Sequence, residues 1–326
     1  MRKIRARCWS ACVLVLACNS TAVWAADAYP QRPIRLIIPF TAGGSTDVAQ
    51  RIVAQKLSER FGQQVVADNR PGAGTMLATE LAARALPDGY TLLCVTASYT
   101  INPSIFKKLP YDAEKTFAPV TMVAAGPTVL VVNPVVPGTT VKDLIAFAKA
   151  KPGQLTYGSA GFGSSAHLAS EMFKIMAKVD MVHVPYKGDP QAVADLMSGQ
   201  IQMLFVGAWS SVAQHVNSGK LKALAVASAQ PTPLVPDLPT VASAGLPNFE
   251  AIVWNGIVVP SGTPIAIVNR LQREISDSIR QADVRTKFHS MGVEPGGQSS
   301  AEFRQFLRAQ LARWATVVKQ AGIKPE

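Results

Sequence analysis

Short runs of β-branched and apolar residues alternate with helical patterns from Arg35 onward, and this alternation constrains the fold more than any other feature. Grouped apolar residues predict buried strands, whereas apolar residues spaced by three or four predict helices. Val48, Ile52, Val53 and Leu57, for example, share one stripe of a helix. Because such alternation is typical of βαβ units, we expect an α/β protein with mostly parallel sheets.

The first part of the chain contains three βα steps. Strands are predicted at 34–40, 64–68 and 91–96, and helices at 46–61 and 75–86. Near Pro119 the pattern changes to two extended runs, 120–123 and 128–133, broken by Gly126-Pro127. We interpret this break as a crossing into a second domain.

The second domain is predicted to contain helices at 141–150, 165–177 and 189–198 and strands at 155–158, 181–185, 203–206 and 221–227. After a proline-rich loop, the chain returns through a strand at 252–259 and helices at 264–279 and 301–321. We therefore expect two α/β lobes: 26–124 and 229–326 form one, and 125–228 the other. Two crossings between lobes are typical of a hinged clamshell with its cleft at the carboxyl ends of the strands.

The N-terminus resembles a secretory signal peptide. Four basic residues precede an apolar stretch from Trp9 to Ala17, and small residues around Ala25 offer a cleavage site. We expect residues 1–25 to be removed and the protein to reach the periplasm. A membrane anchor is the alternative, although the apolar run is only about half the length that spans a bilayer.

Cysteine positions limit the covalent chemistry. Cys8, Cys12 and Cys18 lie in the leader, which leaves Cys94 alone in the mature chain, so an internal disulfide or zinc cluster is not expected. The residues ahead of Cys18 loosely resemble a lipoprotein cleavage site, so a lipid anchor on Cys18 is a further alternative; Leu16 fits that pattern poorly.

Composition argues against disorder and against nucleic-acid binding. The chain has 326 residues, of which 48% are hydrophobic and 16% charged, enough for two domains with cores. Four of the 32 basic residues lie in the leader, and the others are scattered rather than clustered beside aromatic residues. We expect a solvated, moderately basic surface, whose field would also favour capture of an anionic solute.

The segment from Pro39 to Asp47 combines a strand end, the glycine pair Gly43-Gly44 and a polar helix start. Glycines allow a sharp turn and close approach of a ligand, and the first amides of a helix are unpaired at the positive end of its dipole. This pattern predicts an anion-binding cradle. An ordinary βα turn with Ser45 or Thr46 as the N-cap fits the same residues equally well.

A second segment, 157–167, has the same character, since it runs from a strand into a helix with three glycines and three serines. Two cradles in opposite lobes would hold a dicarboxylate or an amino acid from both ends. His167 lies in the first helical turn, where capping or packing is more common than ligand contact. At the next strand end, Lys187 could complement a ligand carboxylate, although a solvated lysine is the commoner outcome.

Signals of catalysis are weak. The sequence has no Gly-x-Ser-x-Gly elbow, its four histidines lack metal-ligand spacing, and Cys94 lies in an apolar strand. Gly72-Ala73-Gly74 lacks the third glycine of a dinucleotide fingerprint and the lysine of a phosphate loop. We expect no metal, no cofactor and no enzymatic activity, while a serine–histidine pair assembled across the cleft stays open as an alternative.

Seven separated motifs occur in order along the chain: Pro39-Phe40 with Gly43-Gly44 and Asp47; Asn69-Arg70-Pro71-Gly72-Ala73-Gly74; Pro87-Asp88-Gly89-Tyr90-Thr91-Leu92; Leu109-Pro110-Tyr111-Asp112; Tyr186-Lys187-Gly188; Gly219-Lys220-Leu221 with Ala223-Leu224-Ala225; and Leu238-Pro239-Thr240-Val241 with Gly245-Leu246-Pro247. With these motifs the chain resembles, from about Tyr29 to the C-terminus, the extracytoplasmic solute-binding receptors of tripartite tricarboxylate transporters, also called Bug (TctC) receptors.

The resemblance implies a type II periplasmic binding protein fold, monomeric, that closes on a small carboxylate and presents it to a membrane permease. It assigns ligand contacts to one lobe, to the hinge and to the opposite lobe: Phe40, Thr41, Ala42, Gly43, Gly44 and Asp47; Thr96 and Ser98; and Ser159, Gly161, Gly163, Ser164, Ser165, His167, Lys187, Gly207 and Ala208. A periplasmic hydrolase or isomerase on the same scaffold, or a sensor for a membrane signalling partner, is the alternative function.

One departure from the family pattern bears on the ligand. Family members usually place an aspartate in the strand end that here reads Phe205-Val206-Gly207-Ala208-Trp209, without an acid. A ligand ammonium left unpaired on closure would be costly. The sequence therefore favours a dicarboxylate or an aromatic carboxylate over an amino acid.

Overall fold

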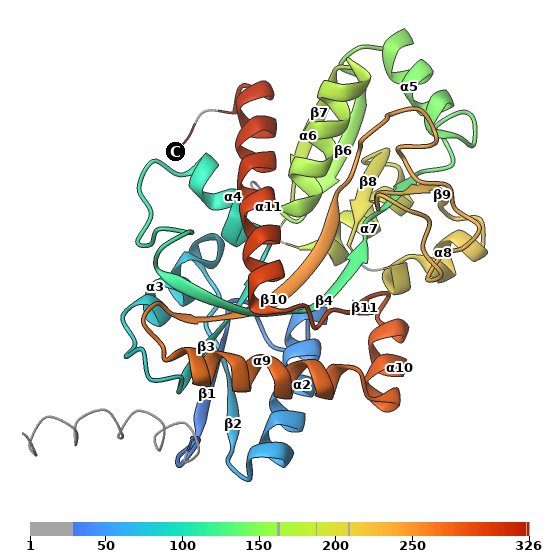
Figure 1. Ribbon diagram of the computed structural model, residues 1–326. Helices are drawn as coiled ribbons and strands as arrows, with labels where there is room; N and C mark the ends of the chain where they lie inside the picture. The colour runs from blue at the N-terminus through green and yellow to red at the C-terminus, as the bar shows by residue number, and fades with distance from the viewer. Residues whose placement is uncertain (1–28, 162–163, 187, 208, 324, 326) are drawn as a thin grey trace, which may run out of the picture.

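The computed structural model describes residues 29–161, 164–186, 188–207, 209–323 and 325, so the predicted signal peptide and Cys18 lie outside the described residues. Figure 1 shows two sheets with helices around each. The larger has the order β11-β4-β10-β3-β1-β2 and the smaller the order β7-β6-β8-β5-β9. We call the larger sheet with its helices lobe 1 and the smaller sheet with its helices lobe 2.

The strands of lobe 1 are Ile34–Ile38 (β1), Val65–Asn69 (β2), Thr91–Thr96 (β3), Phe117–Pro127 (β4), Ile252–Pro260 (β10) and Glu294–Pro295 (β11). Those of lobe 2 are Val129–Val132 (β5), Leu155–Ser159 (β6), Met181–Pro185 (β7), Met203–Val206 (β8) and Lys222–Val226 (β9). β1 pairs in parallel with β2 and β3, as does β6 with β7 and β8, whereas β10 and β5 are antiparallel to their neighbours.

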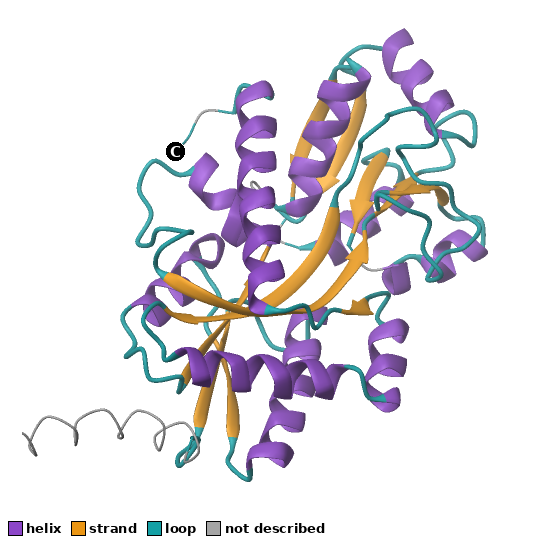
Figure 2. Cartoon of the chain, viewed as in Figure 1, coloured by secondary structure: helices purple, strands orange, loops and turns teal. Residues whose placement is uncertain are grey.

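The helices of lobe 1 are Ser45–Phe61 (α2), Met76–Ala83 (α3), Ala97–Ile105 (α4), Ile265–Ile279 (α9), Ala282–Ser290 (α10) and Ser300–Gln320 (α11), with a 3₁₀ turn at Ala73–Thr75 (η1). Those of lobe 2 are Val141–Ala150 (α5), Ser165–Ala177 (α6), Asp189–Ser198 (α7) and Ala213–Asn217 (α8), with a 3₁₀ turn at Trp209–Ser211 (η2). Figure 2 shows that these helices surround both sheets.

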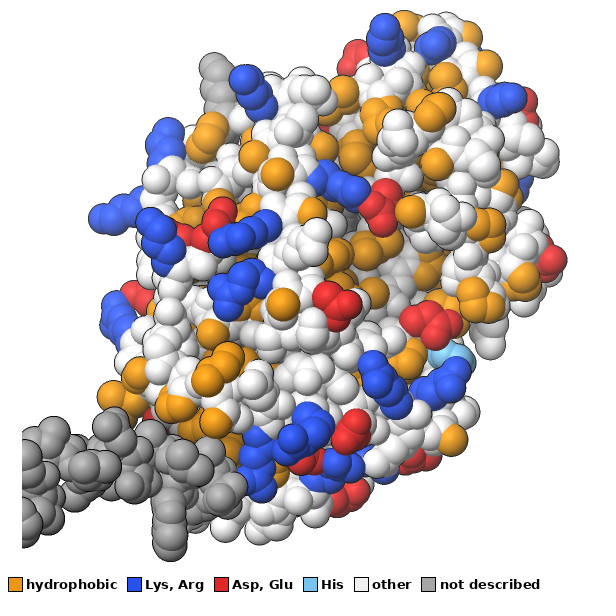
Figure 3. Space-filling view, viewed as in Figure 1, with side chains coloured by type: hydrophobic (Ala, Val, Ile, Leu, Met, Phe, Trp, Pro, Cys, Tyr) orange, Lys and Arg blue, Asp and Glu red, His pale blue; other side chains and the backbone are white. Residues whose placement is uncertain are grey.

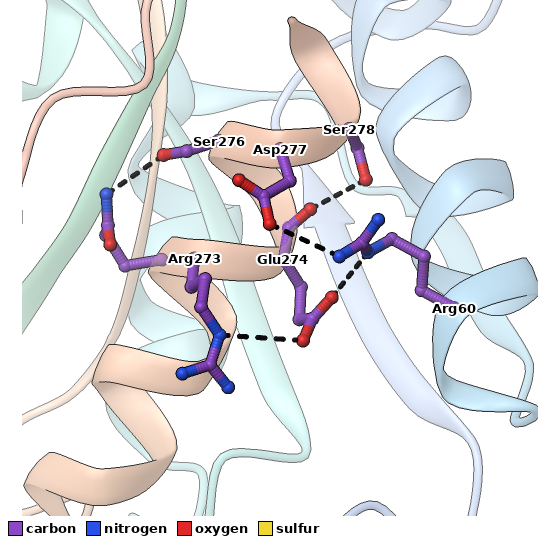
Figure 4. Close-up of polar contacts among 7 residues, drawn as sticks. Arg60, Arg273, Glu274, Ser276, Asp277 and Ser278 are labelled. Atoms are coloured by element: carbon purple, nitrogen blue, oxygen red, sulfur yellow. Dashed lines mark hydrogen bonds and ion pairs between the residues drawn. The ribbon is translucent and has the colours of Figure 1, made fainter. Parts of the chain in front are cut away.

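Helices α2 and α9 pack side by side against one face of the lobe 1 sheet. Val53, Leu57 and Leu271 of these helices are fully buried against the sheet, whereas Val48, at the start of the predicted stripe of α2, is exposed. At the rim, Arg60 of α2 reaches Glu274 and Asp277 of α9, the latter at 3.3 Å (Figure 4). These helices pack against β1, and β1 leads directly into the predicted first cradle.

The chain passes between the lobes at two adjacent places. β4 ends at Pro127 and β5 begins at Val129, so Thr128 alone joins them. The amide of Ala227 donates to the Thr128 carbonyl at 2.7 Å, and the Thr128 hydroxyl donates to the Ala251 carbonyl at 2.7 Å. The two crossings are therefore hydrogen-bonded to each other beside the cleft.

Helix α11 contacts both lobes, because it lies against α4 and β4 of lobe 1 and against α6 of lobe 2 (Figure 1). The predicted helix at 301–321 is confirmed, and one of its faces is apolar, since Phe303, Leu307, Trp314 and Val317 are buried. They belong to one hydrophobic cluster that extends into both lobes. Arg313 adds an ion pair to Glu250, in the second crossing, at 2.5 Å.

Most predicted strands and helices are present, and one of the omissions, helix α4, has a physical reason. The helices α4, α8 and α10 were not predicted. The α4 sequence contains Thr100, Asn102 and Pro103, which are poor helix formers, and it follows β3 with no intervening loop. Contacts with η1, β3, β10 and α11 hold α4 in helical form, and such tertiary contacts are not visible in local sequence.

The surface matches the scattered charge expected from sequence. On the face drawn in Figure 3, Lys and Arg side chains spread over both lobes, and several lie near Asp or Glu. Within the described residues, none of the helices is both long enough and apolar enough to cross a membrane. Cys94 is buried in β3, and burial raises the pKa of its thiol.

Candidate functional site

A cavity of about 230 Å³ lies between the lobes and is lined by residues of both. Lobe 1 contributes residues near the ends of β1, β3, β4 and β10, and lobe 2 contributes residues that follow β6, β7 and β8. The lining residues are Phe40, Ser45, Thr46, Ala49, Thr96, Ala97, Ser98, Ala124, Thr128, Ala160, Ser164, Ser165, Ala166, Asp189, Phe205, Gly207, Val253, Trp254, Asn255, Met291 and Val293.

Four helices begin at this cavity. Lining residues lie in the first turns of α2 (Ser45), α4 (Ala97), α6 (Ser165) and α7 (Asp189). The helices converge because each follows a strand whose carboxyl end lies at the cleft. Helix N-termini present unpaired amides and a partial positive charge, so this arrangement favours an anion. None of the described residues that line the cavity is Lys, Arg or His.

The first turn of α2 leaves its amides available. Its N-cap is Gly44, in extended conformation with no side-chain cap, so neither Ser45 nor Thr46 is the N-cap. The first intrahelical bond runs from the Val48 amide to the Gly44 carbonyl at 2.9 Å. Among the described residues, the amides of Ser45 and Thr46 have no acceptor. They are available to a ligand carboxylate.

Helix α6 is capped differently but with the same result. The hydroxyl of its N-cap, Ser164, accepts a hydrogen bond from the His167 amide at 3.3 Å. This cap satisfies one amide of the first turn and, within the described part of the chain, leaves those of Ser165 and Ala166 without acceptors. The two lobes therefore each present two adjacent free amides to the cavity.

Asp47 holds the first cradle in shape and does not line the cavity. Its carboxylate accepts hydrogen bonds from the Gly43 amide (2.9 Å), the Arg51 guanidinium (2.9 Å) and the Asn69 amide (2.8 Å). Burial opposes ionisation, but these three hydrogen bonds together hold the pKa of Asp47 below its usual value. Asn69 also donates to the Phe40 carbonyl at 2.9 Å, so one network fixes both ends of the loop.

The predicted site residues fall into groups. Phe40, Thr96, Ser98, Ser164, Ser165 and Gly207 line the cavity. Thr41, Ala42, Gly43 and Gly44 form an exposed loop beside it that is absent from its lining, and Gly43 gives its amide to Asp47. Gly161 and Ser159 are also outside the lining. The predicted contacts Gly163, Lys187 and Ala208 lie outside the described residues.

His167 packs within lobe 2. Its ring stacks on His183 with centroids 4.2 Å apart, and His183 stacks on Tyr157 at 4.9 Å. The Nε2 atom of His183 lies 2.7 Å from the hydroxyl of Ser159, which is fully buried. This serine–histidine pair therefore lies inside one lobe and not across the cleft, where its hydroxyl would meet a substrate.

This histidine pair makes the fold sensitive to acid. Burial, with a smaller effect of His183, lowers the pKa of His167 from 6.5 to about 4. Between these values the unfolded chain binds a proton that the folded chain does not, so stability falls as pH falls through this window. We expect the free energy of unfolding to drop by about 2 kcal/mol between pH 7 and pH 5 from this group alone.

The measurement is urea unfolding at several pH values for the wild type and for His167→Gln, which cannot take up the proton. The variant should lose less stability than the wild type over this pH range. Parallel curves for the two proteins would contradict the assignment.

The end of β8 carries no acid, as the sequence indicates, but an acid that was not predicted as a site residue lines the cavity from another element. Asp189, the first residue of α7, lines the cavity. The family pattern places its acid at the end of β8, whereas the acid of this chain follows β7. The signal was present, since Tyr186-Lys187-Gly188 leads from a strand end into a helix start, as at the two predicted cradles. Trp254 and Asn255 of β10 also line the cavity and were not predicted, because the local sequence does not show that this strand reaches the cavity.

Residues 49–323 match the model of the family "Tripartite tricarboxylate transporter family receptor". The chain belongs to this family. It is similar to the protein BugT of Bordetella pertussis, with 36% identity over 314 residues that cover 96% of each chain. The resemblance stated from the sequence motifs is thereby confirmed.

Solved structures agree with this membership. R. palustris Rpa4515 with adipate has 35% identity and a TM-score of 0.81, covering 91% of this chain and 100% of that one. MatC from Rhodopseudomonas palustris with bound malate has 30% identity and a TM-score of 0.77, covering 89% and 100%. The predicted two-lobed α/β periplasmic binding protein fold is confirmed, and family receptors of this kind bind solutes for a tripartite transporter.

Proposed function

We propose that this receptor captures a small carboxylate, either a dicarboxylate or an aromatic carboxylate, and delivers it to the membrane permease subunits of a tripartite transporter without chemical change. The observation that carries this proposal is that the first residues of two helices, α2 and α6, line one cavity from opposite lobes with unpaired backbone amides. Adipate and malate in the two similar structures support a carboxylate ligand. Phe40, Phe205 and Trp254 offer apolar walls for its carbon skeleton.

The capture step follows from the two-lobed arrangement. We assign the six-stranded sheet to lobe 1 and the five-stranded sheet to lobe 2, so that the first crossing is at Thr128, a few residues beyond the boundary after residue 124 that the sequence predicts. A ligand between α2 and α6 contacts both lobes only when they are close together. Its binding therefore favours the closed population, and the closed form is what the permease would recognise.

The proposal includes export and a monomeric state. Residues 1–25 would direct the chain to the periplasm, where a freely diffusing monomer can carry ligand to the permease. A lipid on Cys18 would instead keep it at the membrane surface. Mass spectrometry of the protein isolated from its own cells separates these two mature forms, since only the second retains Cys18 with its lipid.

Proline substitutions test the role of the amides directly. Proline is tolerated at the first helical position, and Gly44 and Ser164, which precede Ser45 and Ser165, are already extended as proline requires. Ser45→Pro and Ser165→Pro should each weaken carboxylate binding about tenfold or more, because a charge-assisted hydrogen bond is lost. Ser45→Ala and Ser165→Ala are the matched controls, since they remove the hydroxyl and keep the amide.

The measurement is isothermal titration calorimetry with succinate, adipate, malate and benzoate, combined with melting temperatures. We expect the wild type to bind at least one of these acids and to melt at a higher temperature in its presence, with no product formed. Absence of binding to every acid would overturn the proposed function. Equal effects of the proline and alanine variants would show that the amides are not the contacts.

A further inference from the structure

The cavity contains one feature that a simple carboxylate does not explain. Asp189 is the only ionisable residue among the described residues that line it. Its carboxyl has no hydrogen-bond or ion-pair partner within the described part of the chain. Two other acids of lobe 2 are at least partly buried, and both have partners. Glu171 contacts Tyr157 and Lys174, and Asp195 accepts a hydrogen bond from the Tyr186 hydroxyl at 2.7 Å.

Leaving a carboxyl group unpaired in a cleft is costly. Burial raises the pKa of Asp189, which reflects the cost of its charge away from water. Closure of the lobes over a ligand would remove more water from it. An anionic ligand that offered only carboxylates would add repulsion to this cost.

The positions of the donors and of the acid divide the cavity into two parts. The free amides of α2 and α6 suit a ligand carboxylate, while Asp189, at the start of α7, supplies an acceptor. α6 and α7 each follow a strand of one parallel pair, β6 and β7, so their first residues are neighbours at one edge of the lobe 2 sheet. A ligand that reaches both needs a carboxylate and a hydrogen-bond donor on one small skeleton.

We propose that Asp189 is a specificity-determining residue that selects carboxylates carrying a hydrogen-bond donor, a hydroxyl or ammonium group, over the unsubstituted acids. This inference rests on the proposed function and narrows its ligand class. Both donor groups would give the unpaired carboxyl a partner on closure. A site built around a polar partner discriminates strongly against analogues that lack it, since the buried polar group is then left unsatisfied.

The test uses two matched sets of probes that differ in one substituent. Succinate, malate and aspartate form the first set; phenylacetate, mandelate and phenylglycine form the second, so that each contains an unsubstituted, a hydroxyl and an ammonium member. Calorimetry on the full mature chain should show a dissociation constant at least about tenfold lower for a substituted member than for the unsubstituted one.

Two variants locate the cause of that preference. Asp189→Leu removes charge and acceptor, so it should abolish the preference of about tenfold, whichever donor group is involved. Asp189→Asn removes the charge and keeps one acceptor oxygen, while the other oxygen is replaced by an NH2 donor: it should abolish a preference for ammonium and retain part of a preference for hydroxyl. The control is Asp180→Asn, which removes an exposed acid of the same lobe and should leave the ratios unchanged.

The outcomes distinguish the specificity role of Asp189 from the proposed function as a carboxylate receptor. If the acids bind but the substituted members have no advantage, or if Asp189→Leu weakens succinate as much as malate and aspartate, the role of Asp189 is overturned while the receptor function stands. If no acid of either set binds to the wild type, the carboxylate function itself fails. Loss of the preference in Asp189→Leu but not in Asp180→Asn, with succinate or phenylacetate still bound, supports the proposal.

Discussion

Replacing Thr46 by tryptophan is expected to abolish ligand binding and to leave the fold intact. Thr46 is half-buried at the second position of α2, where it lines the cavity beside an amide that we assign to the ligand. An indole at this position would occupy much of a cavity of about 230 Å³. Because the added atoms enter space that is open in the protein, they should not force the core apart. We expect the dissociation constant to rise at least about a hundredfold.

The control for this variant is Ala301→Trp. Ala301 occupies the same second position of a helix, α11, but is exposed and outside the cavity lining. Calorimetry with the acid that binds the wild type best, together with melting temperatures without ligand, separates the two effects. Retained binding by a folded Thr46→Trp protein would place the ligand elsewhere.

Removing the Asp47 carboxylate should produce the largest loss of stability among changes near the site. The carboxylate is 1% exposed and accepts three hydrogen bonds, from Gly43, Arg51 and Asn69. Asp47→Ala leaves these donors without their acceptor and loosens the loop that precedes α2. We expect the free energy of unfolding to fall by about 2–3 kcal/mol, since hydrogen bonds to charged groups are among the stronger ones.

Glu80→Ala provides the comparison for Asp47→Ala. It also removes an acid four residues from an arginine on a helix, but the Arg84–Glu80 pair is exposed to solvent. Such pairs contribute only about 0.5 kcal/mol or less. Urea unfolding measures both variants. Equal stability of Asp47→Ala and Glu80→Ala would show that the hydrogen bonds of Asp47 do not stabilise the loop before α2.

Local sequence patterns correctly predicted the helices and strands whose side-chain spacing is enough to determine them. The buried run of β1 and the long helix α11 follow from side-chain spacing alone, and both elements were predicted. Helix α4 was not, because packing against its neighbours overrides its weak helix propensity. The division of the chain into two sheets could be predicted, since each crossing interrupts the strand and helix pattern.

The same distinction applies to the site. Sequence identified the loops that begin α2 and α6, because glycines and small polar residues after a strand indicate helix starts. It did not distinguish Asp47, which faces the protein, from Asp189, which lines the cavity, since both are acids in a first helical turn. Which of them contacts the cavity depends on partners such as Asn69, which is 22 residues away in the sequence.

The hydrophobic cluster that α11 shares with both lobes has a consequence for how the protein unfolds. It joins Leu93 of the larger sheet, Trp314 of the helix and Phe173 of the smaller lobe. Neither half could be separated without exposing apolar surface that now covers the other. We therefore expect the lobes to unfold together in one cooperative transition, although the backbone passes between them twice.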